Sequence, residues 1–318
     1  CATGCSVRVD ENRNTIYRLK PRHNPEVNNW WMCDDGRLGY HFVGSDDRLS
    51  RPRKRQADGW CDVEWPEVIE SLRDELVAAA GEGDGRGLAF VLSPMLACEE
   101  AYLAGEYALS LNPNVQLVLG HVPVVGEDDV YPKSPGMAPV GGDFTIRAEK
   151  CPNRRGVAAL IEGWGHPLVG FEELLERIVA GEVTGVVLTG GYHLPWLTTE
   201  QAAVLSRLEL LVRTDILSQE ASRECGDYLL PGAAWAEKSG SYVNHDGFLQ
   251  GTQRAVRPPG EARSEGRIFW ELAGRARLYH VGDVLDELAG KMTFFAPCAD
   301  GAVGELGIAL GRQEESVT

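Results

Sequence analysis

The chain has 318 residues, of which 43% are hydrophobic and 25% charged, which is ordinary usage for a soluble globular protein with a substantial core and more than one domain or subdomain. Its formal net charge of −16 repels phosphate backbones, so nucleic acid is a poor candidate partner. The longest apolar runs, such as Leu88 to Leu92, are far shorter than the roughly 20 residues of a spanning helix, which argues against direct membrane insertion.

Three of the eight cysteines lie near the start of the chain, where Cys1, Cys5 and Cys33 form the pattern C-x3-C-x27-C. Such spacing in an acidic, enzyme-like chain favours thiolate ligation of iron over a disulfide, because a four-iron cluster needs several soft sulfur ligands that converge on it. The alternative is a set of unrelated buried thiols. Gly4 weakens that alternative, since its backbone freedom lets the chain fold around a ligand.

The cysteines also indicate whether residues precede this sequence and in which cellular compartment the protein resides. One ligand of a four-ligand set is missing, and the chain begins on Cys1 without an initiator Met, so we expect residues upstream of this sequence. The other five cysteines are isolated in the sequence, as buried thiols in a reducing compartment are. A cytoplasmic protein is therefore expected.

Residues 1–62 predict a small β-rich module. Val7 and Val9 alternate with polar residues, turn chemistry follows at residues 11–14, and residues 15–19 read as a second strand. An irregular polar stretch around residues 24–28 then brings the chain back to Cys33. We expect this module to wrap around a cluster.

Residues 63–318 predict an α/β domain. From Trp65 to Leu76 the apolar residues repeat at helical spacing, and residues 88–92 read as a strand buried in a parallel sheet. Alternating strands and amphipathic helices indicate a doubly wound, mostly parallel α/β sheet, followed by a hairpin and a helical region. The expected helices are 94–110, 155–162, 171–179, 199–207 and a helical region over 261–290; the expected strands are 115–119, 185–189 and 208–214, and the expected hairpin is 238–250.

Several motifs have a plain structural interpretation that outweighs a functional one. Cys98 falls in a predicted helix and is better explained as a small buried residue. His121 and His193 each follow a strand, where a hydrogen-bonded turn is favoured over a proton-transfer or ligand role. The glycines of residues 81–87 precede a strand rather than open a helix, so they predict a linker. The basic run of residues 48–55 is better explained as a solvated loop, or as a salt-bridging contact to an acidic neighbouring subunit, than as a nucleic-acid patch.

The motifs together resemble a known family. Cys1-Ala-Thr-Gly-Cys5, the Asn-Pro-Glu-Val-Asn of residues 24–28 and the Trp-Met-Cys-Asp-Asp-Gly-Arg-Leu of residues 31–38 resemble the [4Fe–4S] module at the head of the molybdopterin oxidoreductase superfamily. Within it, the similarity is greatest to the family of G-type (75 kDa-type) subunits of NADH:quinone oxidoreductase, respiratory complex I. Further matching segments span almost the whole chain and include residues 93–102, 151–157 and 230–244.

The resemblance implies which cysteines bind the cluster, and it implies that the α/β domain lacks a molybdenum cofactor. Cys1, Cys5 and Cys33 would be cluster ligands, and the fourth cysteine of the family would lie three positions before Cys1. Active relatives present a metal ligand from an α/β turn and carry a C-terminal barrel domain, and neither has an evident counterpart here. We therefore expect a degenerate domain without molybdenum cofactor, with no catalytic and no cofactor-binding residues in the α/β body.

The function implied is that of an electron-transfer and scaffold subunit of a NADH-oxidising complex, with no independent active site, which passes single electrons through the cluster. Its expected partners are other iron–sulfur and flavin subunits, on the cytoplasmic side of a membrane-bound complex. Arg37, beside Cys33, would either tune the cluster potential or pair with Asp34 or Asp35. The alternatives are a catalytic molybdenum or tungsten pterin enzyme of the formate dehydrogenase kind, and a structural module without a cluster.

Overall fold

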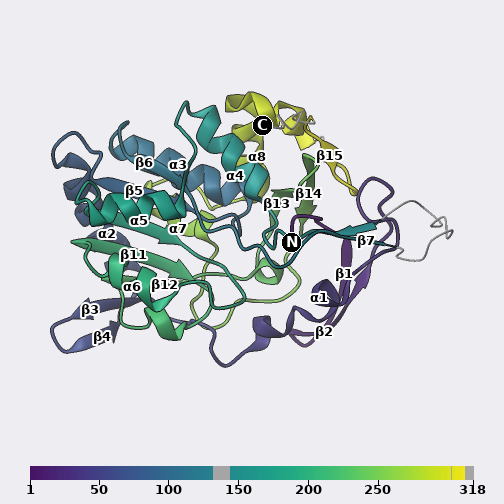
Figure 1. The fold of residues 1–318 in the computed structure, drawn as a ribbon, viewed down its shortest axis with the longest axis horizontal. Helices are drawn as coiled ribbons and strands as arrows, with labels where there is room; N and C mark the ends of the chain where they lie inside the picture. Colours follow the sequence, from purple (N-terminus) through teal and green to yellow (C-terminus); the bar gives the residue numbers. More distant parts are fainter. Residues whose placement is uncertain (132–143, 302, 312–318) are drawn as a thin grey trace.

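The computed structural model describes residues 1–131, 144–301 and 303–311 (Figure 1). Its centre is an eight-stranded sheet in the order β4-β3-β12-β11-β10-β5-β6-β9. The six strands from β12 to β9 run parallel, and β3 joins them antiparallel through β12. The strands are β3 Arg53–Gln56, β4 Gly59–Asp62, β5 Leu88–Leu92, β6 Gln116–Leu119, β9 Val169–Gly170, β10 Gly185–Thr189, β11 Leu210–Asp215 and β12 Tyr228–Pro231.

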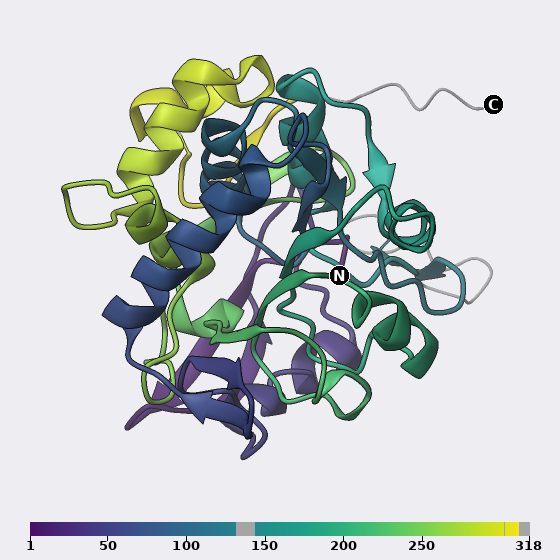
Figure 2. The same ribbon diagram turned by 90° about the vertical axis from the view of Figure 1, so that its left-hand side faces the viewer.

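Helices cover both faces of this sheet, so the predicted doubly wound α/β fold is confirmed. One face of the strands packs against α2, α3, α4, α7 and α8, and the other against α5 and α6. Figure 2 shows α2 and α6 on opposite sides of the strands. The helices are α2 Trp65–Gly81, α3 Cys98–Leu111, α4 Arg154–Gly163, α5 Phe171–Val179, α6 Thr199–Leu205, α7 Glu265–Leu272 and α8 Val281–Lys291.

The apolar stripe of α2 explains how the sequence places a helix on the sheet. Its side chains at positions 65, 68, 69, 72 and 76 are all buried, as the helical spacing predicts. Burial of a leucine-sized side chain stabilises the fold by about 1.5–3 kcal/mol, so this stripe holds α2 firmly on the sheet. Strand β5 is buried on both faces, as expected of a central parallel strand.

The thiol-bearing part of the chain forms a separate layer beside the sheet. Strands β1 Val7–Asn12 and β2 Thr15–Pro21 form the predicted hairpin, and the short helix α1 Asp34–Leu38 follows Cys33. A three-stranded sheet of β13 Gly240–Val243, β14 Phe248–Thr252 and β15 Ile308–Ala309 lies between this layer and the helices (Figure 1). The predicted late hairpin is therefore present.

Four expectations about element boundaries need correction. Residues 53–62, assigned to the cluster module, form β3 and β4 and extend the sheet of the body, so the structural junction precedes Arg53. Helix α3 begins at Cys98 rather than near residue 94, because residues 93–97 form a loop whose last amide, Ala97 N, donates to Glu100 Oε2 at 3.0 Å. Helix α6 ends at Leu205, two residues early, and β11 starts at Leu210. The helical region after residue 261 is two helices separated at residues 273–280.

Two further features concern the edges of the fold. The short pair β7 Asp129–Tyr131 and β8 Phe144–Ile146 was not expected, and most of the Gly/Pro-rich connection between them, residues 132–143, lies outside the described residues. Within the part of the chain that is described, none of the helices is both long and apolar enough to cross a membrane.

Candidate metal centre

The structure brings the three predicted cysteines into one neighbourhood. Cys1 and Cys5 lie on the loop before β1, and Cys33 is the residue that caps the start of α1. Burial raises the pKa of the Cys5 thiol to about 11, and the charge of the nearby Cys33 adds to the rise. Burial lowers the pKa of the Cys1 amino group, an effect that Cys151, Cys5 and Cys33 oppose by their charges. The Cys5 thiol, the Cys33 thiol and the Cys1 amino group are therefore electrostatic neighbours.

The first loop is held in shape by the β13–β14 hairpin. Gly4 N donates to Cys1 O at 3.2 Å, which closes a tight turn between the two thiols. The Gln250 side chain donates from Nε2 to Gly4 O at 2.6 Å, and Asn244 Nδ2 donates to Thr3 O at 3.2 Å. Gly4 has φ +67°, and a Cβ there would stand 2.9 Å from the Cβ of Asn244, so only glycine suits this position.

Asn28 links the Cys5 end of the loop to the Cys33 end. This side chain is 1% exposed, accepts from Ser6 N at 3.0 Å, and donates from Nδ2 to Trp31 O at 2.9 Å. Because Ser6 follows Cys5 and Trp31 precedes Cys33, one buried amide sets the relative position of both thiol-bearing segments. The sequence located the irregular polar stretch but did not predict this role, although an asparagine in a short turn is the available signal.

Cys33 lies where its sulfur receives a backbone hydrogen bond. Gly36 N donates to Cys33 Sγ at 3.4 Å. A backbone donor aimed at a ligand sulfur is one of the means by which proteins set cluster potentials. Arg37 pairs with Asp34 at 3.8 Å and both side chains are exposed, so the ion-pair interpretation of Arg37 holds in this structure. Such an exposed pair contributes little to stability.

Two residues that the cysteine pattern does not include also lie beside these thiols. Cys151 is fully buried, and its thiol donates to Glu149 Oε1 at 3.3 Å. Burial raises the pKa of Cys151 well above its ordinary value and the Glu149 charge adds to the rise, so this sulfur keeps its proton at neutral pH. Burial lowers the pKa of His193, and the Cys1 amino group adds to the lowering. Only the position of His193 after a strand could have pointed to it.

The donor set is chemically compatible with an iron–sulfur cluster. Over residues 1–131, 144–301 and 303–311, no group of three or more His, Cys, Asp or Glu side chains is arranged to hold one metal ion. A cluster of several irons is larger than one ion, so its thiolate ligands stand farther apart. The surroundings of Cys5 and Cys33 combine soft sulfur donors, partial burial and an amide directed at a sulfur, which fits such a group.

At the carboxyl edge of the parallel sheet, where doubly wound folds bind ligands, the loops after β5 and β10 contact each other. The order in which successive strands are added to the sheet reverses between the parallel neighbours β5 and β10. Thr189 Oγ1 links the ends of these two strands, because it donates to Val91 O at 2.6 Å and accepts from Ser93 N at 2.9 Å. Tyr192 is 2% exposed and donates to His121 O at 2.6 Å. A Cβ on Gly191 would stand 3.2 Å from Met95, so the two loops touch.

Cys98 has the properties expected of a buried structural thiol. It lies at the first turn of α3 with no exposed surface, and its sulfur donates to Asn153 Oδ1 at 3.3 Å. Burial raises the pKa of Cys98 well above its ordinary value. A neutral, enclosed thiol of this kind is unreactive.

Comparisons with known proteins find two separate family matches in the chain. Residues 1–41 match the family described as NADH-ubiquinone oxidoreductase NDSU1/NuoG-like, 4Fe-4S domain, and residues 171–275 match Molybdopterin oxidoreductase. The chain is 36% identical over 110 residues to the G subunit of the NADH-quinone oxidoreductase of Streptomyces coelicolor, a match that covers 34% of this chain and 12% of that protein. It is 33% identical over 111 residues to NADH-quinone oxidoreductase subunit 3 of Thermus thermophilus, covering 35% and 14%.

Other relatives belong to different enzymes. A Staphylococcus aureus protein provisionally named a formate dehydrogenase is 29% identical over 108 residues, covering 34% of this chain and 11% of that protein. The solved structure of acetylene hydratase from Pelobacter acetylenicus superposes with a TM-score of 0.52 over 86% of this chain and 68% of that one, at 11% identity, which shows the fold alone. Residues 171–275 thus carry the pattern of molybdopterin oxidoreductases, and residues 1–41 carry that of the 4Fe-4S domain of NADH-ubiquinone oxidoreductase NDSU1/NuoG-like proteins.

Proposed function

We propose that this chain is the part of an electron-transfer subunit that holds one [4Fe–4S] cluster in an oxidoreductase complex of the NADH-quinone oxidoreductase type. The observation that supports the proposal is the proximity of the Cys5 thiol to the Cys33 thiol and to the Cys1 amino group, within the segment that matches the 4Fe-4S domain. A fourth thiolate would come from the position three residues before Cys1, as the family pattern implies. The matched regions span only 12% and 14% of the two complex I relatives, so the activity of a whole subunit is part of the proposal.

The residues of the site have separate tasks in this function. A [4Fe–4S] cluster supplies the capacity to accept and release single electrons. The Gly36 amide donates to the Cys33 sulfur and stabilises negative charge on it. Gln250 and Asn244 fix the backbone of the Cys1–Cys5 loop, so the geometry of the ligands changes little between oxidation states. Lys150 Nζ lies 3.9 Å from Asp35 and adds a positive charge beside the site.

The same proposal assigns no molybdenum chemistry to the α/β body. The closed contact between the loops after β5 and β10, and the buried position of Cys98, support it. The formate dehydrogenase name of one relative supports the alternative of a molybdenum or tungsten pterin enzyme. We propose further that the subunit works beside other iron–sulfur and flavin subunits, on the cytoplasmic side of a membrane-bound complex.

Iron binding by cysteine variants tests the cluster. The natural full-length protein is prepared anaerobically, and iron, acid-labile sulfide, molybdenum and tungsten are measured per chain. We expect about four iron atoms per chain in this site, loss of that iron in Cys5→Ser and Cys33→Ser, and no loss in the control Cys61→Ser, whose free thiol lies on β4. Equal iron in all three variants would overturn the ligand assignment, and stoichiometric molybdenum or tungsten would favour the pterin enzyme.

A further inference from the structure

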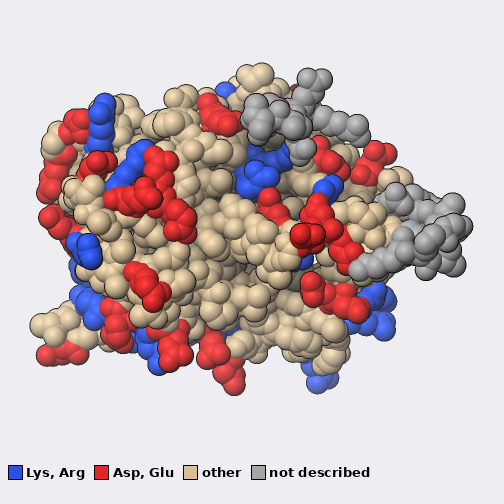
Figure 3. All heavy atoms as spheres, viewed as in Figure 1, with Lys and Arg blue, Asp and Glu red and all other residues tan. Residues whose placement is uncertain are grey.

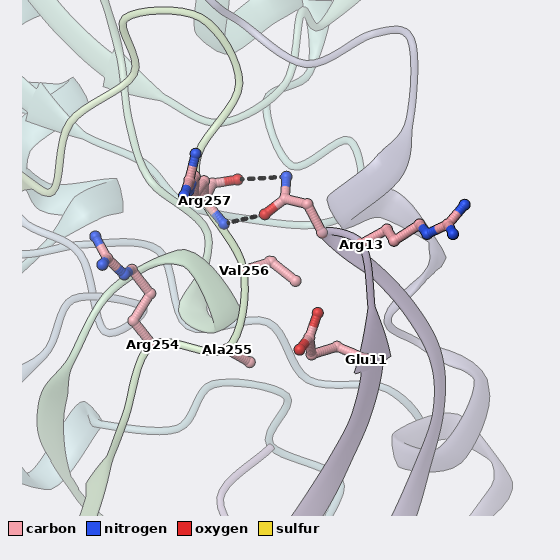
Figure 4. A pocket seen from close by; sticks show the side chains of 7 residues that line it. Glu11, Arg13, Arg254, Ala255, Val256 and Arg257 are labelled. Atoms are coloured by element: carbon pink, nitrogen blue, oxygen red, sulfur yellow. Dashed lines mark hydrogen bonds between the residues drawn. The ribbon is translucent and has the colours of Figure 1, made fainter.

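An open cleft with a basic rim lies where the β1–β2 turn meets the loop after β14. It has a volume of about 530 Å³ and is open to solvent. Figure 4 shows Arg254 and Arg257 on the loop to one side and Arg13 on the turn at the other side. The residues that line it are Glu11, Arg13, Asn14, Arg254, Ala255, Val256 and Arg257.

The cleft is lined by three arginines and by one carboxylate, that of Glu11. Among the described residues, none of Arg13, Arg254 and Arg257 forms an ion pair, and all three side chains are exposed. Basic residues nearby on the same hairpin are neutralised, because Arg18 and Lys20 both pair with Asp10, at 2.5 and 2.9 Å. In a chain with 47 Asp and Glu against 31 Lys and Arg, a group of unpaired arginines is an exception.

The backbone that carries these arginines is fixed. Arg257 N donates to Asn14 Oδ1 at 2.6 Å, a bond drawn in Figure 4. Arg254 N donates to Ser239 Oγ at 3.1 Å, and the amides of Ala255 and Val256 both donate to Ala236 O. A ligand would therefore meet charges on a preorganised frame, which lowers the entropy lost on binding.

Arg13 occupies a position that normally disfavours it. Its φ is +51° and that of Asn14 is +67°, the pair of left-handed residues that a two-residue hairpin turn requires. Glycine and asparagine suit such turns, whereas another residue there costs on the order of 1 kcal/mol. Arg13 is nonetheless held in this conformation beside the cleft, with its side chain exposed and directed away from the loop of Arg254 and Arg257 (Figure 4).

We propose that this cleft binds an acidic, extended segment of a partner protein, whose Asp and Glu carboxylates pair with Arg13, Arg254 and Arg257. The arginine fork matches carboxylates in bidentate geometry. The charge of the whole molecule favours a narrow segment over a broad polyanion. A nucleic-acid duplex or an anionic membrane would be repelled by the acidic surface around the cleft. A peptide segment confined to the cleft would be repelled less, because salt screens the acidic side chains that lie more than about 8 Å from it. Figure 3 shows acidic side chains spread over the face in view.

A labelled peptide tests the proposal. Fluorescence anisotropy is measured with a fluorescein-labelled hexaglutamate peptide with blocked ends, with hexaglutamine as the uncharged probe. We expect only hexaglutamate to bind, with an affinity that falls as salt rises. The double variant Arg254→Gln/Arg257→Gln is expected to bind about tenfold more weakly, and Arg13→Gln less tightly than the unchanged protein. The matched control Arg207→Gln/Arg223→Gln removes two exposed arginines that do not line the cleft and is expected to bind normally.

Three results would overturn the proposal. These are no binding of hexaglutamate, equal binding to the cleft variant and the control variant, and tighter arginine-dependent binding of a DNA duplex or of phosphatidylserine vesicles than of the peptide. The proposal does not rest on the cluster. The same titration with Cys33→Ser protein is expected to give unchanged peptide binding, so failure of one proposal leaves the other standing.

Discussion

Gln250 donates a hydrogen bond of 2.6 Å from its side-chain amide to the carbonyl of Gly4, across 246 positions of the chain. The same side chain accepts from Ser6 Oγ and from Asn24 Nδ2, both at 3.1 Å. One residue of the β13–β14 hairpin thus holds both sides of the thiol loop. The cluster module is therefore positioned by the body, not only by its own short hairpin.

Replacement of Gln250 should loosen the thiol loop. We predict that Gln250→Ala lowers the iron retained per chain after gel filtration and shifts the reduction potential, because the loop between Cys1 and Cys5 loses its donor. The expected loss of folding stability is about 1–3 kcal/mol, from the unpaired polar groups left behind. Gln253→Ala, at an exposed position three residues later, is the matched control and should change neither quantity. Unchanged iron retention and potential in Gln250→Ala would show that the loop holds its own shape.

Hydrophobic patterns in the sequence predict individual helices and strands, whereas contacts between residues far apart in the sequence are seen only in the structure. The strand at residues 88–92 and the helix from Trp65 could be predicted, because their hydrophobic periodicity reports burial directly. The positions of β3 and β4 could not, since they depend on pairing of Arg53 with Leu229. For the same reason, the spacing of Cys1, Cys5 and Cys33 indicated a cluster, but not the roles of Asn28 or Gln250.

Buried carboxyl groups predict a distinctive pH dependence of stability. Burial raises the pKa of Glu99 and of Glu265 to about 7 from an ordinary value of 4.5. The folded chain thus binds these protons more tightly than the unfolded chain. Their contribution to the free energy of unfolding is full below pH 4.5 and falls as pH rises towards 7, by up to about 1.4 kcal/mol per pH unit for each group.

Glu99→Gln isolates part of this effect. Glu99 accepts from Ser241 N and Ser241 Oγ, both at 2.9 Å, and lies beside a second buried group in which Lys238 contacts Glu100 and Glu265 at 2.7 and 2.9 Å. Urea unfolding of the unchanged protein and of Glu99→Gln between pH 5 and 8 measures the difference. We predict a shallower fall of stability with pH in the variant. Parallel curves would contradict the raised pKa of Glu99.

The buried ion pair between Arg48 and Glu237 makes another prediction. Its two bonds of 2.6 Å join side chains that are only 3% and 2% exposed, so Arg48 forms a buried ion pair within the chain rather than belonging to a solvated loop or to a salt bridge with a neighbouring subunit. Arg48→Met leaves the Glu237 carboxylate buried without its partner, and we expect a loss of about 3–5 kcal/mol in the free energy of unfolding. Arg51→Met, which removes an exposed pair at 3.9 Å, should cost less than about 1 kcal/mol. Similar losses in chemical denaturation of the two variants would disprove this difference between a buried and an exposed pair.

Low-temperature electron paramagnetic resonance of the reduced full-length protein tests most directly whether the cysteine site holds a cluster. The spectrum is recorded after anaerobic reduction of the unchanged protein, Cys33→Ser and the control Cys61→Ser, each with circular dichroism to verify folding. We predict an iron–sulfur signal in stoichiometric amount with the chain, absent or altered in Cys33→Ser and unchanged in Cys61→Ser. A folded protein whose signal survives loss of Cys33, or that shows no iron–sulfur signal at all, would contradict the assignment.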